Sequence, residues 1–326
     1  MIPSNVIWLD GLYIRFHKDS EANLGHVNMD TIIPMIQMME TFDLRTDRAH
    51  IIDDWGSVIK LGKKNLWTLL TKEPVRSWSN FSSSALSDTH WVCFKHYLLG
   101  SISKGMLYQV KNNFNREPLL RTVRAHMLHM VELDPKPAAN CHTPFITVWC
   151  NTHGRNITNI DEVVSALSSK YGTGNVLKFT PDGFTMQEQA MIMQKTSVFI
   201  CHYGGGSHIM MFLPPGSAVL YVGDDLFTIN PNTWWIVPVG GDDHYFGVTE
   251  QRKIWNFLPD VFFVNYRFGQ VPLPTRIGNN VSLAGEISKE HLAEWNVEKE
   301  WKMTLSPAKT VMYVDSAVAH CASWTV

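Results

Sequence analysis

One stretch of the chain, residues 197–217, limits the possible folds more than any other part of the sequence. It begins with the apolar run Ser197–Cys201, continues through three consecutive glycines (Gly204–Gly206) and ends at a Pro-Pro-Gly break before a second apolar run. Apolar runs without polar alternation are typical of parallel strands that helices cover on both faces. The stretch therefore predicts a buried strand, a tight glycine turn and a short helix that begins near Ser207.

The remainder of the second half alternates in the same way. We predict strands at Phe145–Cys150, Asn175–Phe179 and Ala218–Val222, and helices at Asn159–Ser169 and Thr185–Lys195. Strands that alternate with helices form a parallel sheet covered on both faces. The second half is therefore expected to be a Rossmann-like α/β lobe.

The first half contains a similar but less regular alternation. It predicts strands at Val6–Phe16, Ala49–Asp54 and Trp91–Leu99, a helix with apolar residues spaced from Ile32 to Phe42, and a helix at Pro118–Glu132. We expect a second Rossmann-like lobe here.

The division into lobes follows from length and from two prolines. A chain of 326 residues exceeds the usual size of one hydrophobic core, and Asp134–Asn140 contains Pro135 and Pro137, which interrupt both helices and central strands. We predict lobes at 1–137 and 138–285, with a cleft between them. Residues 286–326 are expected to form a terminal helix, at Ile287–Met303, and a tail that pack back across the lobes.

Composition excludes several classes of protein. The net charge of −2 and the charged fraction of 18% provide no field that attracts polyanions, so nucleic acid is not expected as a partner. No apolar run approaches the ~20 residues that span a bilayer, and the first residues do not resemble a signal peptide. These features favour the cytosol, or the Golgi or ER lumen if an amino-terminal anchor has been removed.

The cysteines do not form a recognisable framework. There are five, widely spread and mostly within apolar strings, and no two have C-x-x-C spacing. This pattern is more typical of buried free thiols than of disulfides or a metal site.

The glycine turn is suited to binding an anion. Ligands of open parallel sheets bind beyond the carboxyl ends of the strands. Glycines let the backbone approach a ligand closely, and the start of a helix offers unpaired N–H groups and a positive dipole end to a diphosphate. A nucleotide diphosphate fits without a metal ion, although the glycines could also serve only to make a tight turn.

At this point the residues resemble a known family. Thr196–Ser217 is similar to the hallmark of glycosyltransferase family 61, in which a buried strand leads to His-Gly-Ala-Gly-Leu-Thr and then to Phe-Leu-Pro-Pro-Gly. Further residues fall on the family's shorter motifs: Asn23, Gly25, His26, Asp30, Pro34, Cys93, Phe94, Gly100, Arg155, Asn159, Asp161, Glu162, Glu188 and Gln189. Three positions depart from the pattern: Tyr203 stands where the family has its histidine, Asn151 replaces an arginine and Ile160 replaces a glutamate.

The resemblance implies a GT-B-like fold, with two Rossmann-like lobes and a nucleotide-sugar cleft between them. It also implies an inverting transferase that takes a sugar from a UDP-sugar, with xylose favoured and N-acetylglucosamine next. The acceptor would be a glycan or glycoprotein. No cofactor or metal is expected, because metal-dependent transferases commonly use a D-x-D pair and this sequence contains none.

Two groups of candidate site residues follow. The donor-binding candidates are Arg155, Glu188, Gln189, His202, Tyr203, Gly204, Gly205, Gly206, Ser207 and His208. The counter-charge for the leaving diphosphate is expected from the helix end, Arg155 and His208. The acceptor hydroxyl needs a general base, for which His26 and Asp30 are the first candidates and Asp53 or Asp54, at the end of a predicted strand, the next.

Other classes fit less well. A nicotinamide-dependent oxidoreductase needs G-x-G-x-x-G after its first strand, and a hydrolase of the nucleophile-elbow type needs G-x-S-x-G; the turn has neither spacing. The remaining alternative is a non-catalytic carbohydrate- or nucleotide-sugar-binding protein that keeps the fold.

Overall fold

The chain divides into two compact units, each of which we describe by itself. Unit 1 comprises Met1–Asp134 and Phe184–Gln187, and unit 2 comprises Pro135–Gly183 and Glu188–Val326. The computed structural model describes residues 6–17, 31–53, 66–85, 91–101, 117–151, 156–202, 205–222, 227–229, 236–238, 246–247, 260–266, 295–296 and 302–324.

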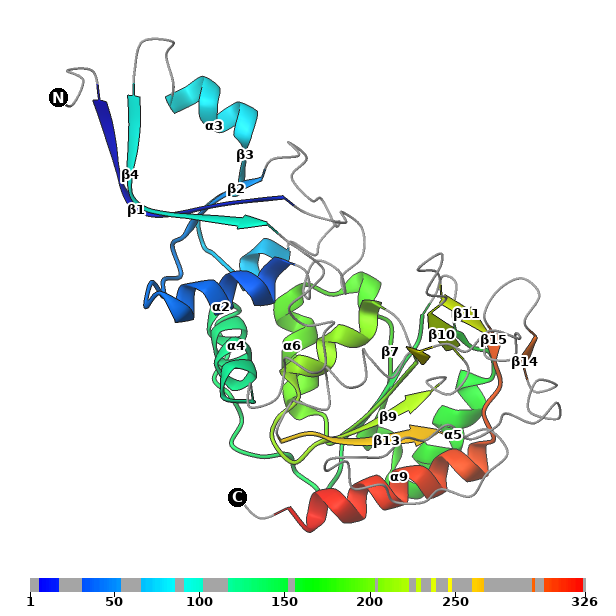
Figure 1. Cartoon of the computed structure of the whole chain (residues 1–326). Helices are drawn as coiled ribbons and strands as arrows, with labels where there is room; N and C mark the ends of the chain where they lie inside the picture. The colour runs from blue at the N-terminus through cyan, green and yellow to red at the C-terminus, as the bar shows by residue number, and fades with distance from the viewer. Residues whose placement is uncertain are drawn as a thin grey trace. The chain divides into compact units, whose positions relative to one another are not determined.

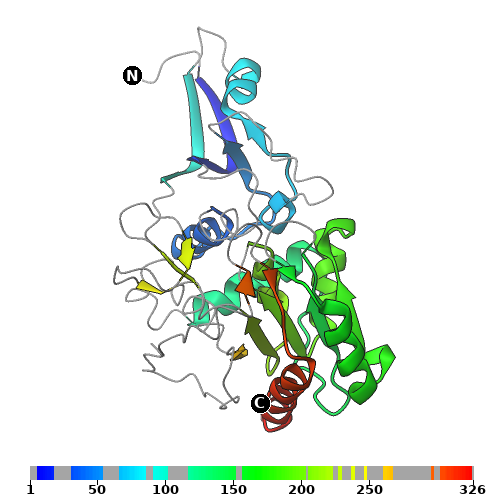
Figure 2. The same cartoon turned by 90° about the vertical axis from the view of Figure 1, so that its right-hand side faces the viewer.

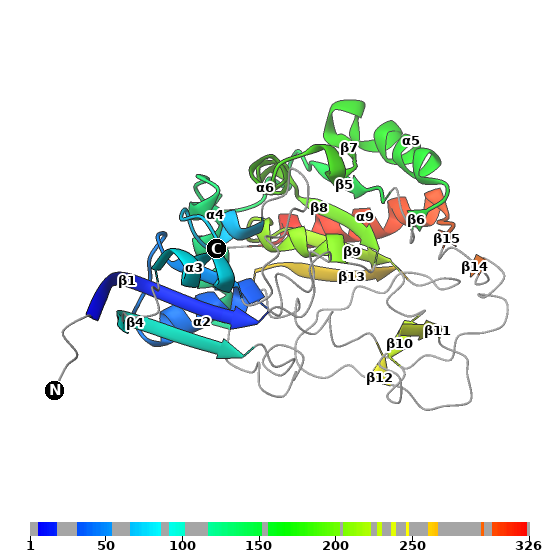
Figure 3. The same ribbon diagram turned by 90° about the horizontal axis from the view of Figure 1, so that it is seen from above.

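Unit 1 contains a parallel sheet of four strands. The strands are β1 (Val6–His17), β2 (His50–Asp53), β3 (Arg76–Ser77) and β4 (Trp91–Ser101). Their spatial order is β3-β2-β1-β4, and every neighbouring pair is parallel. The two long strands β1 and β4 run side by side (Figure 3). The strands predicted in the first half of the chain are therefore present.

Helices accompany this sheet. They are the α-helices α2 (Ile33–Thr41), α3 (Trp78–Ala85) and α4 (Glu117–Met130) and the short 3₁₀ helix η2 (Leu66–Leu69). Pro34 lies in the first turn of α2, where a missing N–H breaks no helical hydrogen bond. The periodic residues Ile33, Ile36 and Met39 are buried, and α2 packs against α4. The apolar spacing in the sequence therefore marks the core side of α2.

Unit 2 contains a parallel sheet of five strands. They are β5 (Ile146–Trp149), β7 (Val176–Phe179), β8 (Val198–His202), β9 (Ala218–Val222) and β13 (Phe262–Tyr266). Their spatial order, β7-β5-β8-β9-β13, corresponds to chain order 2-1-3-4-5, and every neighbouring pair is parallel. This is a doubly wound sheet, and the order reverses between β5 and β8. The α/β class predicted from the sequence is confirmed.

Helices cover both faces of the second sheet. The α-helices are α5 (Ile160–Tyr171), α6 (Met186–Lys195) and α9 (Pro307–Ala322), and the 3₁₀ helices are η4 (Thr173–Asn175), η5 (Pro181–Gly183) and η6 (Gly205–Phe212). Helices α5 and α9 contact each other on one face, and α6 lies on the other (Figure 1). The side-chain amide of Gln194, on α6, donates to the carbonyl of Phe212 at the end of η6.

The chain's last helix differs from the prediction. We expected a helix over Ile287–Met303, but the described residues within that range form the short strands β14 (Trp295–Asn296) and β15 (Lys302–Met303), which precede α9 (Figure 2). Strand β15 pairs with β6 (Asn156–Ile157). For these described residues the prediction is wrong; a helix start signal lies further on, where the Ser306 hydroxyl accepts from Lys309 N at 3.3 Å and Pro307 occupies the first turn.

Three further short strands form a separate antiparallel sheet in unit 2. They are β10 (Phe227–Ile229), β11 (Ile236–Pro238) and β12 (Phe246–Gly247), with β10 in the middle.

Asn159 fastens the start of α5 to the segment before α9. Its amide nitrogen donates to the carbonyl of Leu305 at 2.7 Å, and its amide oxygen accepts from the Leu305 N–H at 2.9 Å. The hydroxyl of Thr158 donates to the carbonyl of Met303 at 3.3 Å. Asn159, which matches a motif of the family that the sequence resembles, therefore has a structural role in this chain.

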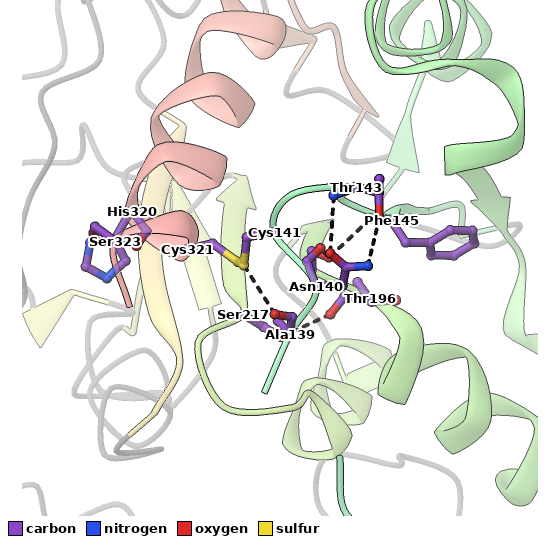
Figure 4. The surroundings of a disulfide bond; sticks show 11 residues. Ala139, Asn140, Cys141, Thr143, Phe145, Thr196, Ser217, His320, Cys321 and Ser323 are labelled. Atoms are coloured by element: carbon purple, nitrogen blue, oxygen red, sulfur yellow. Dashed lines mark hydrogen bonds between the residues drawn. A yellow bond between two sulfur atoms is a disulfide. The ribbon is translucent and has the colours of Figure 1, made fainter. Parts of the chain in front are cut away.

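A disulfide joins Cys141 to Cys321, with 5.6 Å between the Cα atoms (Figure 4). Cys141 precedes β5, and Cys321 lies in the last turn of α9. The Ser197 hydroxyl donates to the carbonyl of Asn140 at 2.7 Å, which holds the segment of Cys141 near the start of β8. The expectation that all cysteines are free thiols is therefore wrong for this pair. The two are 180 residues apart, and only the packing of α9 brings them together.

Among the helices that the structure describes, none combines the length and the apolar character that crossing a bilayer requires.

Candidate functional site

The glycine turn lies at the carboxyl end of β8, beside the point where the sheet reverses its order. All residues of β8 are buried, and the chain resumes as η6 at Gly205. Ligands of doubly wound sheets bind outside the carboxyl ends of the strands at such a reversal. The structure therefore places the most distinctive sequence feature of the chain at the expected binding position of this fold.

Trp149 is the last residue of β5 and lies against the turn. Its indole ring stacks on the imidazole of His202, with 4.2 Å between the ring centroids and 16° between the ring planes. A Cβ atom added at Gly206 would lie 2.3 Å from the Cζ2 atom of Trp149. No side chain fits there, so glycine at this position lets the backbone of the turn approach the indole.

Sequence reasoning missed Trp149. Its position at the carboxyl end of a buried strand is the one signal that could have indicated a site residue. Its contact with His202 and Gly206 depends on β5 and β8 being neighbours, which no local pattern reports.

The described side chains at the turn are less accessible than the backbone at Gly206. His202, Ser207 and His208 are buried, whereas Gly206 is only partly buried. Among the described residues of the turn, the exposed surface is therefore the backbone at Gly206, as expected where a chain approaches a ligand closely.

The first N–H groups of η6 can bind an anion. In a 3₁₀ helix the first three N–H groups have no partner within the helix, and the dipole favours negative charge at that end. A phosphate group placed there would receive hydrogen bonds from the N–H groups of Gly205 and Gly206.

Glu188 and Gln189, on α6, have different surroundings. The Gln189 side chain is fully buried, and its amide nitrogen donates to the carbonyl of Pro181 at 3.3 Å. Glu188 is exposed. Gln189 therefore helps to fix the segment between β7 and α6, while Glu188 is available to solvent.

Several candidates lie outside the described residues, namely Arg155, Tyr203, Gly204, His26, Asp30 and Asp54. Asp53 is described. It ends β2, lies opposite Phe16 and Ser77 on the neighbouring strands, and is 1% exposed. It is therefore shielded from solvent.

The thiol beside the turn is not a nucleophile. Complete burial raises the pKa of Cys201 well above the ordinary value for a cysteine. The group therefore stays protonated near neutral pH, and thiols react as thiolates.

The described residues contain no cluster of three or more His, Cys, Asp or Glu side chains arranged to hold a metal ion.

Unit 1 contains a hollow of about 460 Å³ that adjoins a second hollow of about 310 Å³. Both are lined by Thr68, Met130 and Glu132. Lys72, at the edge of the larger hollow, forms an ion pair with Asp47 at 2.8 Å. These hollows and the glycine turn belong to different units.

Comparisons with known proteins match the chain to a family. The profile of the family described as Glycosyltransferase 61 matches residues 24–220. An EGF domain-specific O-linked N-acetylglucosamine transferase of Xenopus laevis is 27% identical over 157 residues, which cover 44% of this chain and 29% of the Xenopus protein. The chain thus matches less than a third of the length of that relative.

Among solved structures, the chain is similar to TibC, a bacterial iron-containing dodecameric glycosyltransferase from enterotoxigenic E. coli H10407. The likeness has a TM-score of 0.32 and 13% sequence identity, and it covers 72% of this chain and 64% of TibC. It is too distant to bear on function.

Proposed function

Because the chain belongs to glycosyltransferase family 61, we propose that it transfers a sugar from a UDP-sugar to a hydroxyl group of a glycan or glycoprotein. The observation that carries the proposal is the glycine turn, which joins β8 to η6 where the sheet order reverses. A nucleotide diphosphate has the charge and the shape that such a turn binds.

The proposed reaction is an inverting, metal-independent displacement. The acceptor oxygen attacks the anomeric carbon as the bond to the diphosphate breaks, so UDP leaves with the negative charge. The N–H groups at the start of η6 would stabilise that charge, and Arg155 would add a positive charge beside them. These groups take the place that a metal ion has in other transferases.

The proton of the acceptor hydroxyl needs a base. We assign this role to His26 or Asp30, with Asp54 as the next candidate. An imidazole titrates near neutral pH, and a carboxylate four residues further along the chain could orient it or accept the proton itself.

The Xenopus relative alters the expected order of donors. The sequence resemblance alone favours xylose, but the relative is named for the transfer of N-acetylglucosamine. We therefore place UDP-N-acetylglucosamine first and UDP-xylose second, with a protein-linked acceptor.

The test is turnover of a donor panel by the purified full chain. UDP release is measured with UDP-N-acetylglucosamine and UDP-xylose, each with an acceptor glycoprotein, with and without a chelator. We expect release that depends on the acceptor and is insensitive to the chelator, and NMR of the product should show the inverted anomeric configuration. Absence of both UDP binding and UDP release across the panel would overturn the proposal.

Variants of the base separate catalysis from binding. His26→Ala or Asp30→Asn should reduce turnover by at least about a hundredfold while UDP affinity stays unchanged. If both variants turn over like the unmodified chain, the assignment of the base is wrong. A chain that binds UDP-sugars but transfers none to any acceptor would instead be the non-catalytic binding protein considered above.

A further inference from the structure

Trp149 contains a buried hydrogen-bond donor. Its side chain is 4% exposed, and in the part of the chain that the structure describes its Nε1–H has no acceptor. Most buried polar groups in native proteins are hydrogen-bonded, and an orphaned one commonly marks a functional group or a ligand that is not in place. The indole therefore has one bond to make that the described chain does not supply.

The ring atoms beside this donor lie against the glycine turn. The ring atoms nearest to a Cβ position on Gly206 are Cζ2 at 2.3 Å, Cη2 at 2.8 Å and Cε2 at 3.1 Å. Cε2 is the atom bonded to Nε1, so the N–H group lies close to the turn. Because Gly206 is only partly buried, a ligand can reach the turn at this position.

The start of η6 determines which kind of acceptor can bind there. The unpaired N–H groups of a helix start attract an anion, whose oxygens accept several hydrogen bonds at once. We propose that Trp149 is a donor-binding residue whose Nε1–H donates to a phosphate oxygen of the nucleotide diphosphate at this turn. The inference rests on the proposed function and adds a residue that neither the sequence analysis nor the family match indicates.

The stacking on His202 helps the indole to bind a ligand, because it holds the ring in one orientation. A side chain already held in its bound orientation loses little freedom when the ligand arrives. Trp149 therefore offers a positioned donor, and the hydrogen bond is strengthened because the acceptor is charged.

The first test removes the N–H group and keeps the shape of the ring. Trp149 is replaced in the full chain by 3-benzothienylalanine, in which sulfur takes the place of the indole N–H, and UDP affinity is measured by calorimetry. We expect UDP to bind at least about tenfold more weakly, because one hydrogen bond to a charged group is lost. The matched control is the same replacement at the exposed Trp91, which should leave UDP affinity unchanged.

The second test observes the N–H group in the unmodified chain. The indole resonance of Trp149 is identified by its absence in Trp149→Phe, and the unmodified chain is then titrated with UDP, UMP and uridine. We expect a large shift with UDP and none with uridine, since uridine has no phosphate. A shift with uridine as large as that with UDP would contradict a phosphate acceptor.

The outcomes separate this inference from the proposed function. If the unmodified chain binds UDP, but the analogue binds it equally well and the resonance does not move, the role of Trp149 is refuted and the transferase proposal stands. If the unmodified chain does not bind UDP at all, both are overturned.

Discussion

Replacing Gly206 by alanine tests the geometry of the turn most directly. The added methyl group would lie 2.3, 2.8 and 3.1 Å from three ring atoms of Trp149, whereas carbon atoms in good contact are about 3.5–4.0 Å apart. Either the indole or the backbone of the turn must therefore move by roughly 1 Å. The indole has little room, because it is buried and stacked on His202.

The expected magnitude follows from this clash. Overpacking a filled site costs about 1–3 kcal/mol, and displacing a side chain from its rotamer adds about 0.5–1.5 kcal/mol. Alanine also reduces the freedom of the unfolded chain, which offsets about 0.4–1 kcal/mol. We expect Gly206→Ala to lower the free energy of unfolding by about 0.5–4 kcal/mol, and to weaken UDP binding because the turn is displaced.

The assay is thermal unfolding monitored by circular dichroism, and UDP affinity is measured in parallel. A domain of this size loses about 2–4 °C in Tm for each kcal/mol. Gly174→Ala is the matched control, because Gly174 lies in η4 of the same unit and nothing lies within 4 Å of its added Cβ. We expect the control to be as stable as the unmodified chain or slightly more stable.

The reasoning fails if Gly206→Ala is as stable as Gly174→Ala. A double-mutant cycle with Trp149→Phe adds a second criterion. The phenyl ring is smaller than the indole, so Gly206→Ala should be tolerated better in that background, with a coupling of about 0.5–3 kcal/mol. Additive effects of the two substitutions would mean that the glycine and the indole do not constrain each other.

Three further outcomes are expected. Cys141→Ser should lower the free energy of unfolding by about 2–4 kcal/mol in denaturant titrations, because it opens the disulfide to Cys321. A reductant should lower the denaturant midpoint of the unmodified chain but not that of the variant. Burial lowers the pKa of His126 below its ordinary 6.5. As the pH falls, the unfolded chain therefore takes up a proton before the folded chain does. The stability that the neutral imidazole contributes is present above pH 6.5 and is lost as the pH falls towards the folded-state pKa. Denaturant midpoints at pH 7.5 and 5.5 should therefore differ less in His126→Gln than in the unmodified chain. Arg155→Ala should weaken UDP binding by about tenfold or more in calorimetry, because a charge-assisted contact is lost; equal affinity would exclude Arg155 from the site.

The local pattern predicted most of the secondary structure. The apolar run at Ser197–Cys201 corresponds to β8, and the run at Ala218–Val222 coincides with β9. Such patterns succeed because burial on both faces demands a continuous apolar strand, and a helix covering a sheet demands apolar residues every three or four positions. The prediction failed within Ile287–Met303, where the described residues form the strands β14 and β15; the capped helix begins at Pro307.

The family and the location of the glycine turn could be recognised from the sequence alone, because both depend on residues adjacent in the chain. Which residues meet at that turn depended on the order of the strands. Trp149 lies next to Gly206 only because β5 and β8 are neighbours across the reversal of the sheet, and Cys141 reaches Cys321 only because α9 packs on the same sheet. Contacts between distant segments are fixed by packing and register, which a local pattern does not encode, so the tertiary structure alone identified the buried indole N–H beside the turn.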